Sequence, residues 1–180
     1  MKYLAIIIVV LIIIFIILYN RIVKLNIRCK NAFASIDNQL KRRKDLIPNL
    51  VETTKGYMEY ETKNLLKITE ARTKNISELA QTSEEITKNI KMILAKAESY
   101  PDLKANELFK NLQIELTGTE DKIAFARQFY NDCVQKYNTV IETFPTNIIA
   151  NIFKYNKKEY FKITDEDRKE VNIKIWYLKV

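Results

Sequence analysis

The chain opens on an uninterrupted apolar stretch. Every residue from Leu4 to Leu18 is apolar, and Tyr3 and Tyr19 flank the stretch as aromatic residues at membrane interfaces commonly do. As a helix, this stretch with its flanks rises about 25 Å, slightly less than the ~30 Å hydrocarbon core of a bilayer. We therefore predict an N-terminal membrane-spanning helix over residues 1–21. Its anchor positions are Tyr3, Leu4, Ile7, Leu11, Phe15, Leu18 and Tyr19.

Beyond this stretch, apolar residues recur at spacings of three and four, which predicts amphipathic helices. Phe33, Ile36 and Leu40 continue the spacing, so we expect the anchor to run unbroken into the first helix of a bundle. A basic turn followed by Asp45 and Pro48 predicts a break near residue 44, because Asp can cap a helix and proline is tolerated in its first turn. A second helix is then expected over residues 46–79.

Three further signals for helix starts and ends divide the rest of the bundle. Residues 82–85 combine hydroxyl groups with acids and predict a new helix start. Residues 100–102, Tyr-Pro-Asp, predict an interruption. Residues 117–120 carry Gly118 and predict a helix stop followed by a fresh cap, with the last long helix over residues 120–143.

The last segment, residues 146–180, has a different character. Apolar and polar residues alternate from Val171 to Tyr177, which permits a short strand, although we favour an extended segment packed on the bundle. With two glycines and three prolines, the chain has few of the turn-forming residues that the loops of a sheet require. The predicted fold is therefore all-α: a single N-terminal transmembrane helix running into an antiparallel four-helix bundle with long helices (22–145), plus a packed C-terminal tail (146–180).

The formal charge of +8 is concentrated beside the apolar stretch. Residues 20–44 hold eight Lys and Arg against one Asp. A nucleic-acid-binding protein usually spreads basic residues over its folded face, so we predict no nucleic-acid partner. Lys2 lies before the span and Arg21, Lys24, Arg28 and Lys30 follow it, which predicts the N-terminus outside and the bundle in the cytoplasm.

The residue types present exclude most catalytic chemistry. The chain holds no histidine, which excludes His-based dyads and His zinc or di-iron sites. Two glycines cannot build a phosphate-binding loop. Cys29 and Cys133 lie about a hundred positions apart and are expected to pack as two free thiols. We predict no enzymatic activity, no metal or cofactor, and no small-molecule substrate.

Polar residues nevertheless recur on the predicted helix stripes. Arg127, Asn131 and Asn138 follow helical spacing on one seam. Such groups cannot be buried unpaired without a cost of several kcal/mol. Two interpretations stay open: an internal network that fixes helix register, or a polar groove for a partner peptide. The complete set is Arg43, Asn49, Glu61, Arg72, Glu120, Arg127, Asn131 and Asn138. We hypothesise that Arg72 and Arg127 pair with Glu61 and Glu120 between helices.

Three blocks of the sequence resemble the LemA family of bacterial membrane-anchored proteins. They are residues 32–51 (AFASIDNQLKRRKDLIPNLV), residues 100–106 (YPDLKAN) and residues 120–145, which end in Phe-Pro. Phe33 stands where the family pattern has tryptophan, and no glycine occurs around residues 153–155, where the family pattern has one in a tight turn.

The resemblance implies a helical bundle behind one membrane helix in the bacterial inner (plasma) membrane, with no established biochemical activity. We expect an interaction or scaffold protein whose N-terminal helix contacts the lipid bilayer and whose bundle binds a protein partner or a second copy. Genes of the family often accompany membrane zinc metallopeptidases. The alternative is therefore an adaptor or regulator of such a peptidase in membrane-protein quality control.

Overall fold

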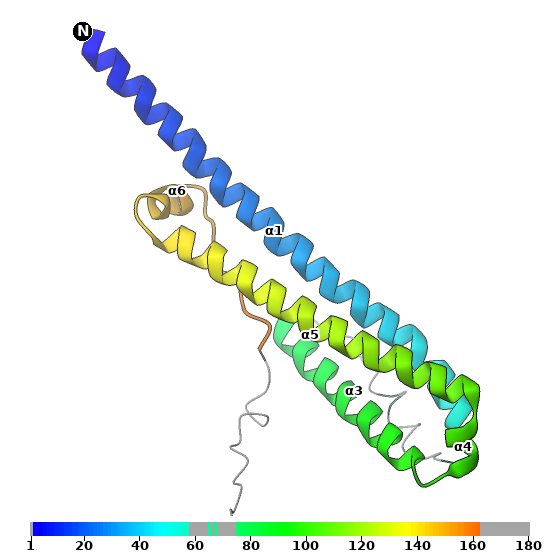
Figure 1. Ribbon diagram of the computed structural model, residues 1–180. Helices are drawn as coiled ribbons and strands as arrows, with labels where there is room; N and C mark the ends of the chain where they lie inside the picture. Colours follow the sequence, from blue (N-terminus) through cyan, green and yellow to red (C-terminus); the bar gives the residue numbers. More distant parts are fainter. Residues whose placement is uncertain (1, 58–64, 66, 68–74, 163–180) are drawn as a thin grey trace, which may run out of the picture.

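The computed structural model describes residues 2–57, 65, 67 and 75–162, and its elements are helical throughout this part of the chain. The helices are α1 (Lys2–Thr54), α3 (Ile76–Ala97), α4 (Pro101–Ala105), α5 (Glu107–Glu142) and α6 (Thr146–Ile152). Figure 1 shows α1 and α5 running antiparallel along the length of the bundle, with α3 beside α5 and with α4 at the end remote from the N-terminus. The prediction of an all-α fold is confirmed.

Helix α1 is both the apolar stretch and the first helix of the bundle. Its N-terminal part projects beyond the other helices (Figure 1), and the apolar side chains from Tyr3 to Ile17 are exposed. Packing begins at Leu18 and Tyr19, and Ile22 is fully buried. Within the described residues, α1 is the one helix long and apolar enough to cross a membrane. The expectation that the apolar helix runs unbroken into the bundle is confirmed.

The predicted break near residue 44 is wrong, because α1 continues through Pro48 to Thr54. Proline removes one backbone hydrogen bond from a helix interior and costs about 3 kcal/mol. Ile47 and Leu50 on either side are fully buried, and so is Thr54, where the helix ends. Burial of this stripe offsets the loss, so residues 46–54 extend the first helix and do not start a second one.

Helix α3 begins at Ile76, six residues before the predicted start at residue 82. Asn75 is the N-cap, and its side-chain oxygen accepts a hydrogen bond from the Glu78 backbone N–H over 2.8 Å. Ser83 is buried in the interior of the helix. Of the rest of the predicted second helix, residues 58–64, 66 and 68–74 lie outside the described residues.

The interruption predicted at residues 100–102 is confirmed. Helix α3 ends at Ala97, Pro101 starts the short helix α4, and Asn106 caps α5 by accepting hydrogen bonds from two backbone N–H groups. The helix stop predicted at residues 117–120 is wrong, because α5 continues through Gly118. Leu116 and Thr119 are buried on the inner face of α5, and this packing offsets the cost of a helical glycine.

The beginning of the C-terminal tail packs on the bundle as expected. Helix α6 is followed by a turn at Lys154, whose φ of 56° lies in the left-handed region. The Tyr155 N–H donates to the Ala150 carbonyl over 2.8 Å, which closes the helix end in the manner of a Schellman motif. The chain then runs without helix to residue 162. The alternating residues 171–177 lie outside the described residues.

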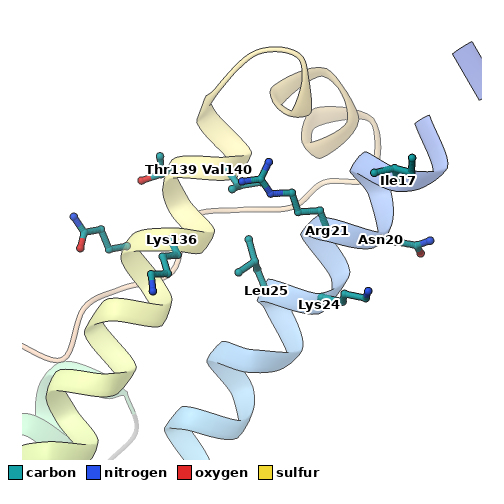
Figure 2. A pocket seen from close by; sticks show the side chains of 9 residues that line it. Ile17, Asn20, Arg21, Lys24, Leu25, Lys136, Thr139 and Val140 are labelled. Carbon is teal, nitrogen blue, oxygen red and sulfur yellow. The ribbon is translucent and has the colours of Figure 1, made fainter. Parts of the chain in front are cut away.

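A cleft of about 890 Å³ opens between α1 and α5 where the apolar stretch ends. Figure 2 shows Arg21 reaching from α1 toward Thr139 and Val140 of α5. Asn20, Gln135 and Thr139 contribute polar groups to the lining. We refer to this feature as the basic cleft, after its charged residues Arg21, Lys24 and Lys136.

Candidate functional site

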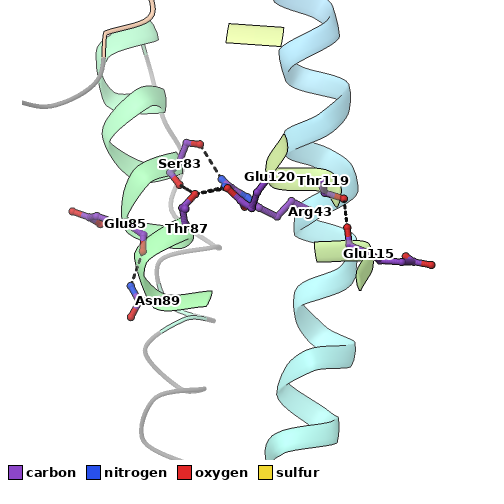
Figure 3. A network of polar contacts seen from close by, with 8 residues as sticks. All are labelled: Arg43, Ser83, Glu85, Thr87, Asn89, Glu115, Thr119 and Glu120. Carbon is purple, nitrogen blue, oxygen red and sulfur yellow. Dashed lines mark hydrogen bonds and ion pairs between the residues drawn. The ribbon is translucent and has the colours of Figure 1, made fainter. Parts of the chain in front are cut away.

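A buried arginine lies at the centre of a polar network that joins three helices (Figure 3). Arg43 of α1 is 2% exposed, and its guanidinium donates to Glu120 Oε1 of α5 over 2.9 Å. It also donates to Thr87 Oγ1 over 2.9 Å and to Ser83 Oγ over 3.0 Å, both on α3. The Thr87 hydroxyl in turn donates to Glu120 Oε2 over 2.7 Å. Each polar group of the set thus has a charged or hydroxyl partner.

This network lies where the two apolar clusters of the bundle meet. One cluster extends from Ile22 to Ile36 on α1, and the other begins at Ile47 on the same helix. A buried charge is tolerated only where its hydrogen bonds are made, so a register shift of any of the three helices is expected to cost several kcal/mol. The geometry therefore favours a role in fixing helix register.

A second polar constellation lies on α5, where two asparagines bind the backbone of the segment after α6. Asn138 Nδ2 donates to the Lys158 carbonyl and Asn138 Oδ1 accepts from the Lys158 N–H, both over 2.9 Å. Asn131 repeats this pattern on Phe161, donating over 3.1 Å and accepting over 2.8 Å. An amide side chain carries one acceptor and two donors, so each asparagine engages both backbone groups of one residue.

Two tyrosines on the same helix extend this constellation. Tyr137 Oη donates to the Asn156 carbonyl over 3.1 Å, and Tyr130 Oη donates to the Glu159 carbonyl over 3.0 Å. Each pair, the asparagines and the tyrosines, is separated by seven residues, which is two helical turns. We call Tyr130, Asn131, Tyr137 and Asn138 the α5 ladder. Six hydrogen bonds thus join it to the backbone of residues 156–161.

Side-chain contacts fix the position of the held segment. Phe161 is 1% exposed, and the Arg127 guanidinium lies 4.9 Å from its ring centroid. Lys158 Nζ lies 5.3 Å from the Tyr137 ring centroid. Such cation–π contacts contribute roughly 0.5–2 kcal/mol each. The side chains of Asn156 and Glu159 are exposed, so the ladder recognises chiefly the backbone and one buried aromatic side chain.

Comparison with known proteins assigns the family. A profile of the LemA family matches residues 32–175. Protein LemA of Metamycoplasma hominis is 30% identical over 149 residues, which covers 79% of this chain and 68% of that protein. The chain belongs to the LemA family. With the exposed apolar part of α1, this membership describes a membrane-associated LemA-type protein.

Shorter stretches of the LemA-family chain are similar to magnetosome proteins. Magnetosome protein MamQ 2 of Paramagnetospirillum magneticum is 33% identical over 70 residues, covering 39% of this chain and 26% of that protein. Magnetosome protein MamQ of Magnetospirillum gryphiswaldense is 30% identical over 69 residues, covering 38% of this chain and 25% of that protein. These two matches span about a quarter of each magnetosome protein.

Two thiols lie in the same apolar cluster as the tyrosines of the α5 ladder. Cys29 and Cys133 are free and buried, as expected. Burial raises the pKa of the Cys29 thiol, and the neighbouring Cys133 raises it further. Burial, followed by electrostatic interaction with the neighbouring Cys29 and Glu159, raises the pKa of Tyr130 to about 12. Both groups are therefore neutral at physiological pH and act as packing and hydrogen-bonding groups. Among the described residues, no cluster of three or more Asp, Glu and Cys is arranged to hold a metal ion.

The structure brings together part of the polar set expected from the sequence. Arg43 and Glu120 meet in one network, although the sequence hypothesis paired Glu120 with an arginine at 72 or 127. Asn131 and Asn138 meet in the α5 ladder. Asn49 is exposed and is not part of either group. Glu61 and Arg72 lie outside the described residues.

Several residues of these sites escaped the sequence analysis. Ser83 and Thr87 lie four residues apart on the inner face of α3. Ser83 was interpreted as part of a helix-cap signal, and Thr87 was not singled out. Hydroxyl groups at this spacing share one helix face and could have indicated partners for a buried charge. Tyr130 and Tyr137 were not included in the predicted polar set, because their hydroxyl partners lie in a segment without helical pattern.

Proposed function

We propose that this protein is a membrane-anchored interaction module without enzymatic activity, whose bundle binds an extended segment of a protein partner along α5. The α5 ladder is the observation that carries the proposal, because it binds an extended peptide backbone at both N–H and carbonyl groups. The segment bound in this structure is the chain's own, residues 156–161. The expected occupants in the cell are this segment, the same segment of a second copy, or a comparable segment of another membrane protein.

The chemistry of the ladder suits a range of partners. Its hydrogen bonds go to backbone atoms, and recognition by main-chain hydrogen bonds places few demands on sequence. Specificity then rests on the buried pocket that Phe161 fills and on the Arg127 guanidinium facing its ring. A partner segment with an aromatic residue at this position satisfies both requirements.

The location of this module is part of the proposal. We infer a single-pass protein of the bacterial plasma membrane with the N-terminus outside and the bundle in the cytoplasm. The excess of Lys and Arg after the span supports this orientation. A cysteine introduced at the exposed Lys88 tests it, because the native cysteines are buried. Labelling by a membrane-impermeant maleimide should require permeabilised cells, and labelling of intact cells would contradict the orientation.

In-cell photocrosslinking tests the interaction. A photoreactive residue at Asp132, which is exposed beside Asn131, should capture a protein partner in the full-length, membrane-bound chain. A control residue at Lys110, near the other end of α5, should not give the same product. Combining Asn131→Ala with Asn138→Ala should reduce the capture at Asp132. Capture unaffected by these two substitutions would contradict binding along the ladder.

The identity of the captured protein separates the candidate functions. A heterologous membrane protein supports the interaction module, and capture of the same chain alone supports a self-assembling scaffold. A membrane zinc metallopeptidase would instead support the adaptor or regulator of membrane-protein quality control.

A further inference from the structure

The basic cleft combines positive charge with apolar walls. Three of the nine residues that line it are basic, Arg21, Lys24 and Lys136, and none is acidic. Ile17, Leu25 and Val140 form apolar walls, and Ile17 belongs to the apolar stretch itself. The cleft is therefore continuous with the predicted membrane span. Its composition suits an amphiphilic anion whose charged group meets the basic residues and whose apolar part follows α1.

Helix α6, near the same end of the bundle, has an exposed apolar face. Ile149 and Ala150 pack into the core, whereas Ile148 and Ile152 are 52% and 63% exposed. The helix contains no charged residue, and Phe144, just before it, is 80% exposed. Apolar residues on one exposed helix face are typical of a helix that lies in a membrane interface.

Aromatic contacts relate α6 to the predicted membrane span. The Phe153 ring, directly after α6, lies 4.9 Å from the Tyr19 ring and 6.3 Å from the Phe15 ring, measured between centroids. The end of α6 therefore lies beside the last turns of the apolar stretch. The exposed Lys154 follows at once in the sequence, and such a long basic side chain can reach the headgroup layer.

We propose that this end of the bundle makes a second, lipid-specific membrane contact. Helix α6 lies in the bilayer interface with its exposed apolar face in the acyl boundary, and the basic cleft binds the phosphate-bearing headgroup of an anionic phospholipid. Arg21 and Lys136, on α1 and α5, face the headgroup from the two sides of the cleft. The acyl chains follow Ile17 along the apolar stretch, which favours a membrane lipid over free phosphate. The contact fixes the bundle against the membrane surface, beyond what a single helical anchor can do.

Lipid selectivity tests the cleft. Full-length protein is placed in nanodiscs of mixed phosphatidylcholine and phosphatidylglycerol, and the lipids retained on release are counted by native mass spectrometry. The wild type should retain phosphatidylglycerol preferentially. Arg21→Gln with Lys136→Gln should weaken that preference by about five-fold for each charge removed. Lys110→Gln with Lys122→Gln removes the same charge from exposed positions nearer the N-terminus of α5 and should leave the lipid preference unchanged.

The possible results separate the two sources of an anionic group. Equal retention of both lipids by the wild type, or an unchanged preference after Arg21→Gln with Lys136→Gln, would overturn the headgroup site. Displacement of phosphatidylglycerol by inorganic phosphate would overturn the assignment to a lipid. Persistence of phosphatidylglycerol in excess phosphate supports it.

A depth measurement tests α6. With Trp176→Phe removing the single native tryptophan, Ile148→Trp places a fluorophore on the exposed face of α6. Nanodiscs of brominated phosphatidylcholine should quench its emission several-fold more than that of Ile114→Trp, an exposed position near the start of α5. Ile152→Trp serves as a second probe on the same face. Equal quenching at positions 148, 152 and 114 would overturn the interfacial placement.

Discussion

Arg43 and Glu120 form an ion pair over 2.9 Å although they lie 77 positions apart in the chain. Arg43 is 2% exposed and Glu120 is 20% exposed, so the pair is only partly screened by water. Breaking a buried pair leaves one charge without compensation, which usually costs more than the intact pair contributes. The pair is therefore a sensitive position for testing how α1, α3 and α5 are held in register.

Arg43→Met should destabilise the bundle by about 3 kcal/mol, because it leaves Glu120 with the Thr87 hydroxyl as a partner but without a cation. Thermal unfolding of the full-length protein in detergent micelles, followed by circular dichroism, measures the change. Arg42→Met is the matched control, since Arg42 is the exposed neighbour and should change stability by less than about 0.5 kcal/mol. Equal effects of the two substitutions would show that the polar network around Arg43 does not stabilise the bundle.

Asn138→Asp should release the segment after α6 from the α5 ladder. The substitution replaces the donor to the Lys158 carbonyl with a second carboxylate oxygen at about the same position, and loss of such a bond costs roughly 1–3 kcal/mol. Hydrogen exchange at the Lys158 and Phe161 amides should accelerate by one to two orders of magnitude. Asp132→Asn, an exposed change on the same helix, should leave both rates unchanged. Unaltered exchange in Asn138→Asp would show that the ladder does not hold the segment.

Helical periodicity predicted the helices well and their ends poorly. The unbroken passage from the apolar stretch into the bundle followed from continued spacing of three and four, and the Tyr-Pro interruption was recognised from proline. Pro48 and Gly118 were overinterpreted, because local propensity is overridden where buried neighbours such as Leu50 and Leu116 hold the helix together. A sequence shows the propensity directly, whereas the opposing burial energy depends on the packing partners.

The candidate site was likewise predicted only in part from the sequence. The seam spacing placed Asn131 and Asn138 on one face and left a register network and a peptide groove as alternatives. In the structure, Arg43 joins a network, whereas the two asparagines hold an extended segment. The tail was predicted to pack on the bundle, but its contacts with the two asparagines were not, because an extended chain bound through its backbone carries no periodic pattern of side chains.

Gly118→Ala should stabilise the protein by about 0.5–1 kcal/mol, since α5 is helical at this position and nothing lies within 4 Å of an added Cβ atom. Gly118→Pro should instead destabilise it by about 3 kcal/mol or more through loss of a helical hydrogen bond. Denaturant unfolding of the two variants measures both signs. A neutral Gly118→Pro would contradict a continuous α5.

Lys154→Gly should also stabilise the protein, by about 1 kcal/mol, because Lys154 occupies the left-handed region that disfavours a Cβ atom. The family pattern expects a glycine in this turn, and the structure forms the turn with lysine in its place. Lys154→Ala removes the same charge but keeps the Cβ atom, so it should bring no comparable gain. Equal stability of the Gly and Ala variants in thermal unfolding would argue against backbone strain at this turn.

Tyr130 should make the bundle sensitive to alkaline pH. Burial raises its pKa in the folded protein to about 12, whereas an unfolded tyrosine titrates near 10. Below pH 10 both states hold the proton and the contribution is complete. Between about pH 10 and 12 the unfolded state loses the proton first, so stability falls as pH rises, by on the order of 2 kcal/mol.

Tyr130→Phe removes this titration together with the hydrogen bond to Glu159, so the stability of the variant should be lower at neutral pH but decline less steeply above pH 10. Unfolding free energies measured from pH 8 to 12 for both proteins compare the slopes, which separates the proton from the lost bond. Identical slopes would mean that the Tyr130 hydroxyl titrates normally and is open to solvent.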